Sequence, residues 1–355
     1  MRAALACACA LAVAGCEESR DAIAPPAASA PAAAGGPLER LPQGWTRLAW
    51  PPFDRASGAA VWTGSELIFW GGDTQADGQH PPDGAVWDAE TDAWSPLPDA
   101  PITGRSQPAA AWTGEEFLVW GGTASGPLGD GAAYDPATEE WRVLPPAPLS
   151  PRVPVVGVWT GRELVVWGDQ SRKERARDGA AFDPAANRWR RLAPAPEPLN
   201  LATGVWTGKE LVVVGAALDD SNLADTDTAR AVAYDPEADR WRTLPAPPLS
   251  PQASTAALTG DGDILAWDYE LHAASWAVGA WRDEAALPLS FSECYPESAS
   301  LPTGVVAWYC GRGALFTAGS REWIALPPRR GFSAGPIAAG PAALFVGPGL
   351  WAYRP

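Results

Sequence analysis

Histidine, methionine and cysteine are scarce in this sequence, which has two, one and five of them in 355 residues. Histidine is the side chain that most readily moves protons or binds metals near neutral pH. Two histidines therefore leave little material for acid–base or metal chemistry. Basic residues are outnumbered 26 to 42, and the formal charge is −16. A field of that sign repels nucleic acid and anionic lipid surfaces, so the charge predicts neither as a partner.

Long hydrophobic runs are also missing, because no apolar run reaches the length of about 18 residues that a membrane-spanning helix needs. The apolar run in "MRAALACACALAVAGC" is short and follows one arginine. Its end, Val13-Ala14-Gly15-Cys16, resembles the lipobox of bacterial lipoprotein signal peptides. The resemblance implies that residues 1–15 are a signal peptide and that Cys16 is lipidated and anchors the protein. An ordinary secretory signal is the alternative.

Residues 16–43 are mostly alanine, proline and small polar residues, without a periodic apolar face. Such a segment cannot bury enough apolar surface to fold, so we expect a tether between the anchor and a globular body at 44–355. Glu17 after the cysteine resembles the sorting signal of outer-membrane lipoproteins. The expected location is the cell envelope, with the outer membrane favoured.

The body repeats one pattern. An apolar segment ends in "WTG", a second such as "ELVVW" follows, and after a variable loop comes "GAAYDPATEEW" or a relative, then "LP". The first four turn glycines, Gly64, Gly114, Gly161 and Gly208, lie 50, 47 and 47 residues apart. Glycine after threonine suits a tight hairpin, and Asp-Pro suits a second turn. Aromatic residues seven apart, such as Tyr134 and Trp141, are expected to pair across the second hairpin as core residues.

Repeats near 50 residues with four short strands are typical of a β-propeller. The "GG" doublets at 71–72 and 121–122, "YDPxTxxW" and "WTGxELxVWGG" resemble the kelch-repeat family over about 44–355. The resemblance implies an all-β, seven-bladed propeller of four-stranded antiparallel blades, with six blades as the alternative. The last unit lacks its fourth strand, and "GWTRLAW" at 44–50 resembles a fourth strand. We therefore expect the N-terminal strand to close the last blade, with Trp45 against Tyr353.

The two rims of such a ring should differ. The first–second and third–fourth turns are short and alike, and we call their side the uniform rim. The second–third loops and the inter-blade connections are long and unlike one another, and we call their side the variable rim. Uniform turns suit a scaffold and variable loops suit recognition, so we expect a ligand at the variable rim.

The candidate ligand-binding residues follow from this placement. Arg55, Arg105 and Arg152 each lie nine residues before the glycine of a "WTG" turn, and Asn200 and Gln252 lie near that position in the next two blades. Some kelch domains use such arginines to hold acidic partners. The alternative is that each arginine pairs with backbone carbonyls between blades. Glu66, Glu116, Glu163 and Glu210 recur at one offset after the turns and are expected to be structural.

Catalytic constellations are missing from the pattern. His80 and His272 fall in different blades, and the acidic loops at 219–227 and 261–263 lack the spacing of a calcium loop. We expect no catalytic residue, metal or cofactor. Cys294 and Cys310 are the cysteines that remain besides Cys16, and in an exported protein they predict a disulfide.

The sequence thus predicts a lipid-anchored, monomeric envelope propeller that binds a partner protein or glycan without catalysis. The alternative is an enzyme that acts on a sugar or peptide in the central channel. A purely structural envelope protein is a third class.

Overall fold

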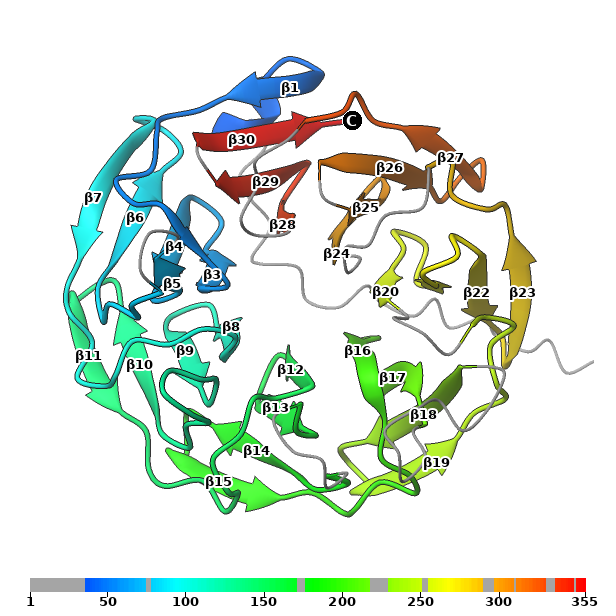
Figure 1. Cartoon of the computed structure of the whole chain (residues 1–355), viewed down its shortest axis with the longest axis horizontal. Coiled ribbons are helices and arrows are strands. Elements are labelled where there is room, and N and C mark those ends of the chain that lie inside the picture. Colours follow the sequence, from blue (N-terminus) through cyan, green and yellow to red (C-terminus); the bar gives the residue numbers. More distant parts are fainter. Residues whose placement is uncertain are drawn as a thin grey trace, which may run out of the picture.

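A computed structural model describes residues 36–74, 78–170, 176–217, 229–250, 255–289, 297–309, 311–329, 336–347 and 349–355. Seven four-stranded antiparallel sheets stand around a central axis in these residues (Figure 1). The expected all-β propeller and its seven blades are confirmed. No helix in the described residues is long and apolar enough to cross a membrane.

Within each blade the four strands are named from the innermost, beside the axis, to the outermost. Blade 1 contains β3 (Ala59–Trp62), β4 (Glu66–Trp70), β6 (Gly84–Asp88) and β7 (Ala93–Leu97), and blade 2 contains β8 (Ala109–Trp112), β9 (Phe117–Trp120), β10 (Gly131–Asp135) and β11 (Glu140–Val143). Blade 3 contains β12 (Val156–Trp159), β13 (Leu164–Trp167), β14 (Gly179–Asp183) and β15 (Arg188–Arg191), and blade 4 contains β16 (Asn200–Trp206), β17 (Leu211–Ala216), β18 (Arg230–Asp235) and β19 (Arg240–Thr243).

Blades 5 and 6 are β20 (Thr255–Leu258), β21 (Ile264–Trp267), β22 (Ala273–Ala277), β23 (Ala280–Glu284); and β24 (Glu297–Leu301), β25 (Gly304–Tyr309), β26 (Arg312–Thr317), β27 (Glu322–Ala325). Blade 7 is β28 (Ile337–Ala339), β29 (Ala342–Gly347), β30 (Gly349–Arg354) and β1 (Gly44–Arg47). A short pair, β2 (Arg55–Ala56) with β5 (Asp73–Thr74), and the 3-10 helix η1 (Pro37–Arg40) complete the described elements.

The N-terminal strand closes the ring. β1 pairs antiparallel with β30, and Trp45 lies directly opposite Tyr353. The Trp45 ring lies 5.1 Å from Tyr353 and 5.0 Å from Phe345, measured between centroids. In Figure 1 the two ends of the described chain meet in this blade. The expected closure is confirmed, and it leaves no blade with an uncovered sheet face.

The body begins earlier than the expected boundary at residue 44. Leu38 in η1 is 4% exposed and packs in the apolar cluster between blades 7 and 1. Arg40 forms an ion pair with Glu90 of blade 1. The sequence predicts a tether at 37–41 because its few apolar residues show no period, whereas in the structure Leu38 and the partly buried Leu41 dock the segment in this cluster.

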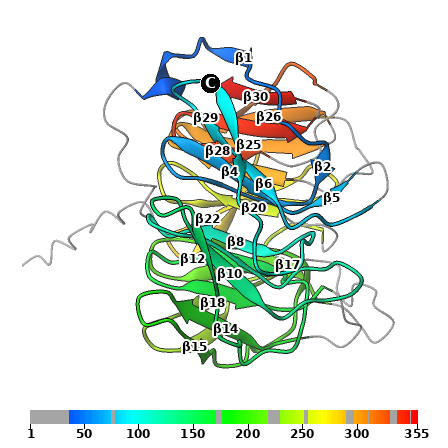
Figure 2. The ribbon, with the colours of Figure 1, turned by 90° about the vertical axis from the view of Figure 1, so that its left-hand side faces the viewer.

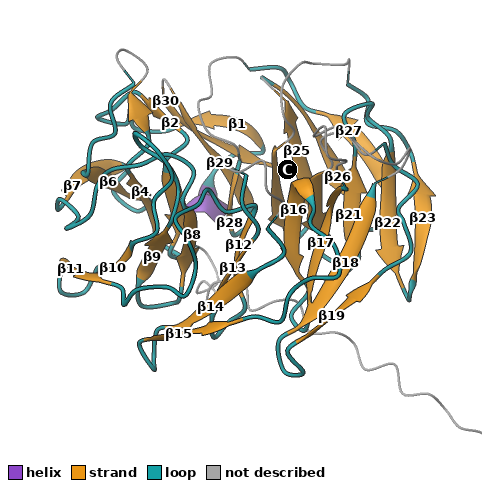
Figure 3. Ribbon diagram, turned by 60° about the horizontal axis from the view of Figure 1, so that its bottom comes forward, coloured by secondary structure: helices purple, strands orange, loops and turns teal. Residues whose placement is uncertain are grey.

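The hydrophobic core is divided into seven clusters, each between two neighbouring blades. Second strands such as β13 are buried along their whole length, as expected of a strand with a sheet on both sides. Figures 2 and 3 show the blades packed side by side with loops at both rims.

The "LP" at the end of a unit links it to the next unit. The leucine is buried, and in the described residues the carbonyl that follows it accepts a hydrogen bond from the fourth-strand tryptophan of the next blade, except where that next blade is blade 6. Trp141 donates to the carbonyl of Pro98 at 2.9 Å and Trp45 donates to the carbonyl of Pro327 at 3.0 Å. The same indole also pairs with the third-strand aromatic of its own blade, as Tyr134 and Trp141 do. The repeated aromatic pairs are therefore core residues, as predicted.

Candidate functional site

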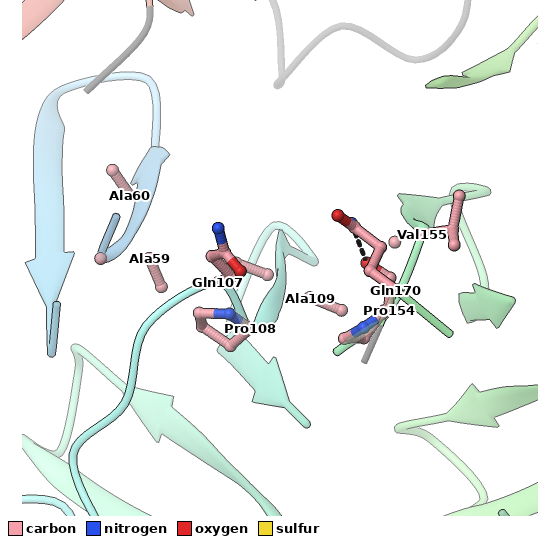
Figure 4. A pocket seen from close by; sticks show the side chains of 11 residues that line it. Ala59, Ala60, Gln107, Pro108, Ala109, Pro154, Val155 and Gln170 are labelled. Atoms are coloured by element: carbon pink, nitrogen blue, oxygen red, sulfur yellow. Dashed lines mark hydrogen bonds between the residues drawn. The ribbon is translucent and has the colours of Figure 1, made fainter. Parts of the chain in front are cut away.

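The variable rim contains a hollow of about 410 Å³ at the channel mouth of blades 1 to 3. The residues that line it come from the inner strands, the connections before them and one second–third loop: Gly58, Ala59, Ala60, Gln107, Pro108, Ala109, Ala110, Pro154, Val155, Gly157 and Gln170. Figure 4 shows these side chains around the open space. This lining has no titratable side chain and no aromatic ring, so it suits a neutral ligand.

Gln107 is held at this hollow by an unusual backbone. Its φ is 54°, in the left-handed region, and Ser57 has the equivalent conformation in blade 1 with a φ of 57°. The Gln107 N–H donates to the Ser57 carbonyl at 2.8 Å, which fixes the two connections to each other. Left-handed backbone at residues other than glycine is costly and concentrates at functional positions. The exposed Gln107 amide makes no hydrogen bond with the described residues, so it is open to a ligand.

Gln170 supplies a second amide from the second–third loop of blade 3. Its Nε2 donates to the Pro154 carbonyl at 2.8 Å, the bond drawn in Figure 4. That bond fixes the side chain and leaves its oxygen as an acceptor. The two glutamines therefore offer amide donors and acceptors above a floor of alanine, glycine and proline.

The floor is rigid because the inner strands pack closely. A Cβ added to Gly157 of blade 3 would lie 2.6 Å from the Cβ of Ala109 in blade 2. Small residues at these positions bring neighbouring blades together and keep the mouth free of bulky side chains.

The predicted arginines lie in the walls between blades. Arg105 is fully buried, and its guanidinium lies 2.8 Å from Asp130 and donates to the carbonyls of Thr103 and Gly121. Arg152 is 2% exposed and lies 2.8 Å from Asp178. The carbonyls lie in the connection before the blade and in the arginine's own blade. Direct contact of these arginines with a ligand stays a prediction.

Arg55 repeats this arrangement in blade 1. Its guanidinium lies 2.7 Å from Asp83 and donates to the Asp83 carbonyl at 3.1 Å. The Arg152 guanidinium, which donates to Asp178, lowers the pKa of that carboxyl below its ordinary value.

The glycine doublets of blades 1 and 2 each bind the backbone of the arginine that follows. The Gly72 N–H donates to the Arg105 carbonyl at 2.9 Å, and the Gly122 N–H donates to the Arg152 carbonyl at 2.9 Å. The doublet of one blade thus binds the backbone of the arginine in the next blade, whose side chain then binds its own blade. The doublet decays at Gly168-Asp169, and the next blade has Asn200 in place of the arginine. The arginine is thus absent where the preceding doublet has decayed at Gly168-Asp169, although Arg55 is present without a doublet in blade 7.

The aspartate partners were missed by sequence reasoning. Asp83, Asp130 and Asp178 each precede the first glycine of a third strand, and the Asp-Gly pair occurs in the same three blades as the arginine. Blade 4 has Ala229-Arg230 in place of the Asp-Gly pair and Asn200 in place of the arginine. The joint occurrence was the available signal.

The remaining candidates lie apart from the hollow or outside the described residues. Asn200 begins β16, where its backbone pairs with Ala216. Gln252, Cys16, Cys294 and Cys310 are outside the described residues, so the lipid anchor and the disulfide stay predictions. His80 lies in a loop of blade 1, and His272 of blade 5 contacts the buried Asp268 at 3.2 Å. Within the described ranges no group of three or more potential ligands could hold a metal ion.

The family model for the KLHDC2/KLHL20/DRC7 Kelch-repeats domain matches residues 57–263, which is more than half of the chain. The chain belongs to the kelch-repeat family. The fold is similar to that of the solved structure of YjhT, with 15% sequence identity and a TM-score of 0.55. That match covers 79% of this chain and 99% of the other, and at this identity it shows the fold alone. The curated proteins contain no match.

Proposed function

We propose that this kelch propeller is a non-catalytic binding protein that holds a segment of a partner protein at the variable rim of blades 1 to 3. The observation that carries the proposal is the neutral hollow with two amide side chains at its edge. A peptide group has one donor and one acceptor, and a glutamine amide can pair with both. The apolar floor suits small side chains of the same segment.

The lining of the hollow also argues against the other two candidate functions, glycan binding and glycosidic catalysis. A glycan site usually presents an aromatic ring to a sugar face, and glycosidic chemistry needs two facing carboxylates. Neither residue type lines this hollow, and the nearby arginines already pair with aspartates. A protein segment without net negative charge is therefore the ligand that the site supports best.

The proposed location is the cell envelope, with Cys16 as the lipid anchor. The support is the sequence "VAGC" followed by the alanine- and proline-rich segment. Several acyl chains on one cysteine would hold the protein firmly, since each buried CH2 contributes about 0.8 kcal/mol. Cys16→Ser should move the protein from the membrane to the soluble fraction, and unchanged retention would contradict the anchor.

Site-specific photo-crosslinking tests the binding proposal. A photoreactive amino acid at Gln107 or Gln170 should crosslink one partner protein in cells, whereas the same group at Lys209 on the uniform rim should not. Ala110→Trp fills the hollow and should remove the crosslink at Gln107 while the protein remains folded by circular dichroism. Adducts that persist in the filled variant, or that form equally at Lys209, would refute the site. Crosslinks to polysaccharide alone would favour the glycan alternative.

A further inference from the structure

The uniform rim has a second recurrent arrangement of side chains, independent of the proposed function. In blades 2 to 4 the fourth-strand tryptophan is followed by an arginine that pairs with the glutamate at the start of the second strand. The pairs are Arg142–Glu116 at 2.6 Å, Arg190–Glu163 at 2.6 Å and Arg242–Glu210 at 2.7 Å. The guanidinium is therefore a regular part of these blades.

Arg190 shows the complete arrangement. Its Nε and Nη2 donate to the two carboxylate oxygens of Glu163, and its Nη1 donates at 3.0 Å to the hydroxyl of Tyr234 in blade 4. The Tyr234 hydroxyl in turn donates to Asp239 at 2.6 Å. One planar guanidinium thus joins two blades through a glutamate, a tyrosine and an aspartate, which suits its fixed set of donors.

Blade 1 keeps the acceptors and lacks the cation. Ser95 lies opposite Val86 in the same register as Arg190 opposite Ala181. The glutamate is present as Glu66, and the tyrosine of the next blade is present as Tyr134. Glu139 of blade 2 stands where blade 4 has Asp239, with a similar left-handed backbone. Each group that surrounds the Arg190 guanidinium therefore has an equivalent at the junction of blades 1 and 2.

The Glu66 carboxylate forms no hydrogen bond or ion pair with any described residue. It lies directly across the strand pair from Asp88, and two like charges in that position repel. Burial raises the pKa of Glu66, and the Asp88 charge raises it further. Val86 is partly exposed, whereas its equivalents Ala133 and Ala181 are covered. An aliphatic surface is thus open beside the unpaired acid, where an alkyl stem can lie.

We propose that the junction of blades 1 and 2 binds an alkylguanidinium group, seated between Glu66 and the Tyr134 hydroxyl with its stem along Val86. The same group already occupies the equivalent place beside Glu163, supplied by the chain itself. The chemistry fits the arginine side chain of another polypeptide or free arginine, and the net charge of −16 attracts either one.

The test is a titration of the full-length protein with propylguanidinium at constant ionic strength, in which ligand-observed NMR measures binding. Propylguanidinium should bind at least tenfold more tightly than propylammonium, because only the guanidinium fits two oxygens and a hydroxyl together. Ser95→Arg fills the site from within and should weaken probe binding at least tenfold. Ser95→Ala is the matched control and should bind as the unchanged protein does.

Two further variants keep the test decisive. Glu66→Gln should abolish binding without loss of fold, and Arg190→Ser should create a second site and raise the stoichiometry from one to two. A capped Ala-Arg-Ala peptide and free arginine distinguish the two sources of the group. Equal binding by Ser95→Arg and the unchanged protein, binding that survives Glu66→Gln, or no difference between guanidinium and ammonium would each overturn the proposal.

Discussion

Val278 is a β-branched residue with a left-handed backbone in a described hairpin turn. It has a φ of 49°, it is fully exposed, and Gly279 follows with a φ of 82°. Two successive positive φ values define a type I′ hairpin turn, for which Asn-Gly is the preferred pair and a β-branched first residue is an outlier. Val278→Asn should therefore stabilise the protein by about 0.5–1 kcal/mol. Chemical denaturation checks this, with Val278→Thr as a β-branched control that should not gain.

Glu66 and Glu163 occupy equivalent positions and should respond oppositely to the same change. Glu66→Gln removes a charge that faces Asp88 without a cation, so it should stabilise the protein by about 0.5 kcal/mol at pH 7. Glu163→Gln breaks the pair with Arg190 and should cost about 1–2 kcal/mol.

The pH dependence of the Glu66 effect has a definite sign. Because the folded-state pKa of Glu66 is raised above 4.5, the folded protein holds this proton more tightly than the unfolded chain does. The Glu66 contribution to stability therefore falls as the pH rises from about 4.5, the ordinary pKa, through the raised pKa of the folded protein. The advantage of Glu66→Gln should appear in the same window and vanish well below pH 4.5. A constant advantage from pH 3 to pH 7 would show that charge is not its cause.

At the scale of single residues, sequence reasoning predicted contacts that repeat and missed contacts that depend on a departure from the repeat. Trp141 was paired with Tyr134 because the same spacing occurs in several units. Ser95 could not be recognised from its own residue type, because it matters only by comparison with the arginine at the equivalent position in other blades. The hollow was not predicted either, since the left-handed backbone of Gln107 has no glycine or asparagine to mark it.

At the scale of elements, the glycine doublet is a connection between blades. A Cβ at Gly122 would lie 2.5 Å from the Ser106 carbonyl oxygen, and the φ of Gly122 is 89°. Gly122→Ala should therefore cost about 2 kcal/mol or more, since both strain and a backbone clash oppose it. Gly64→Ala is the control, because it has a positive φ but no atom within 4 Å of the added Cβ, and it should cost about 1 kcal/mol. Equal losses of melting temperature would show that the doublet serves conformation alone.

The repeated elements could be predicted from the sequence because each has its own chemistry: a threonine–glycine turn, a buried second strand and an Asp-Pro turn. The long loops could not, since their residues follow no period and their shape depends on the neighbouring blade. The ion pair of buried Arg105 with half-exposed Asp130 illustrates this, because one partner precedes the blade and the other ends its longest loop.

At the scale of the whole molecule, closure of blade 7 should control stability. A protein that starts at residue 36 should melt like the full chain. Removal through residue 43 deletes buried Leu38 and should cost about 2 kcal/mol. Removal through residue 50 also deletes β1 and Trp45 and should cost about 3 kcal/mol more. Thermal unfolding of the three proteins checks the order, and equal melting temperatures would contradict the role of β1.

The docking of η1 has a mechanical consequence. β1 is the outermost strand of its blade and pairs with β30 alone among the described strands, so a direct pull on it would peel it away one bond at a time. A pull applied at residue 36 acts first on η1, where Leu38 packs between blades 7 and 1 and Arg354 donates to the Glu39 carbonyl. The Arg40–Glu90 ion pair passes part of that pull to blade 1. The short helix therefore passes a pull applied at residue 36 to blades 7 and 1, so that the pull does not act directly on the pairing of β1 with β30.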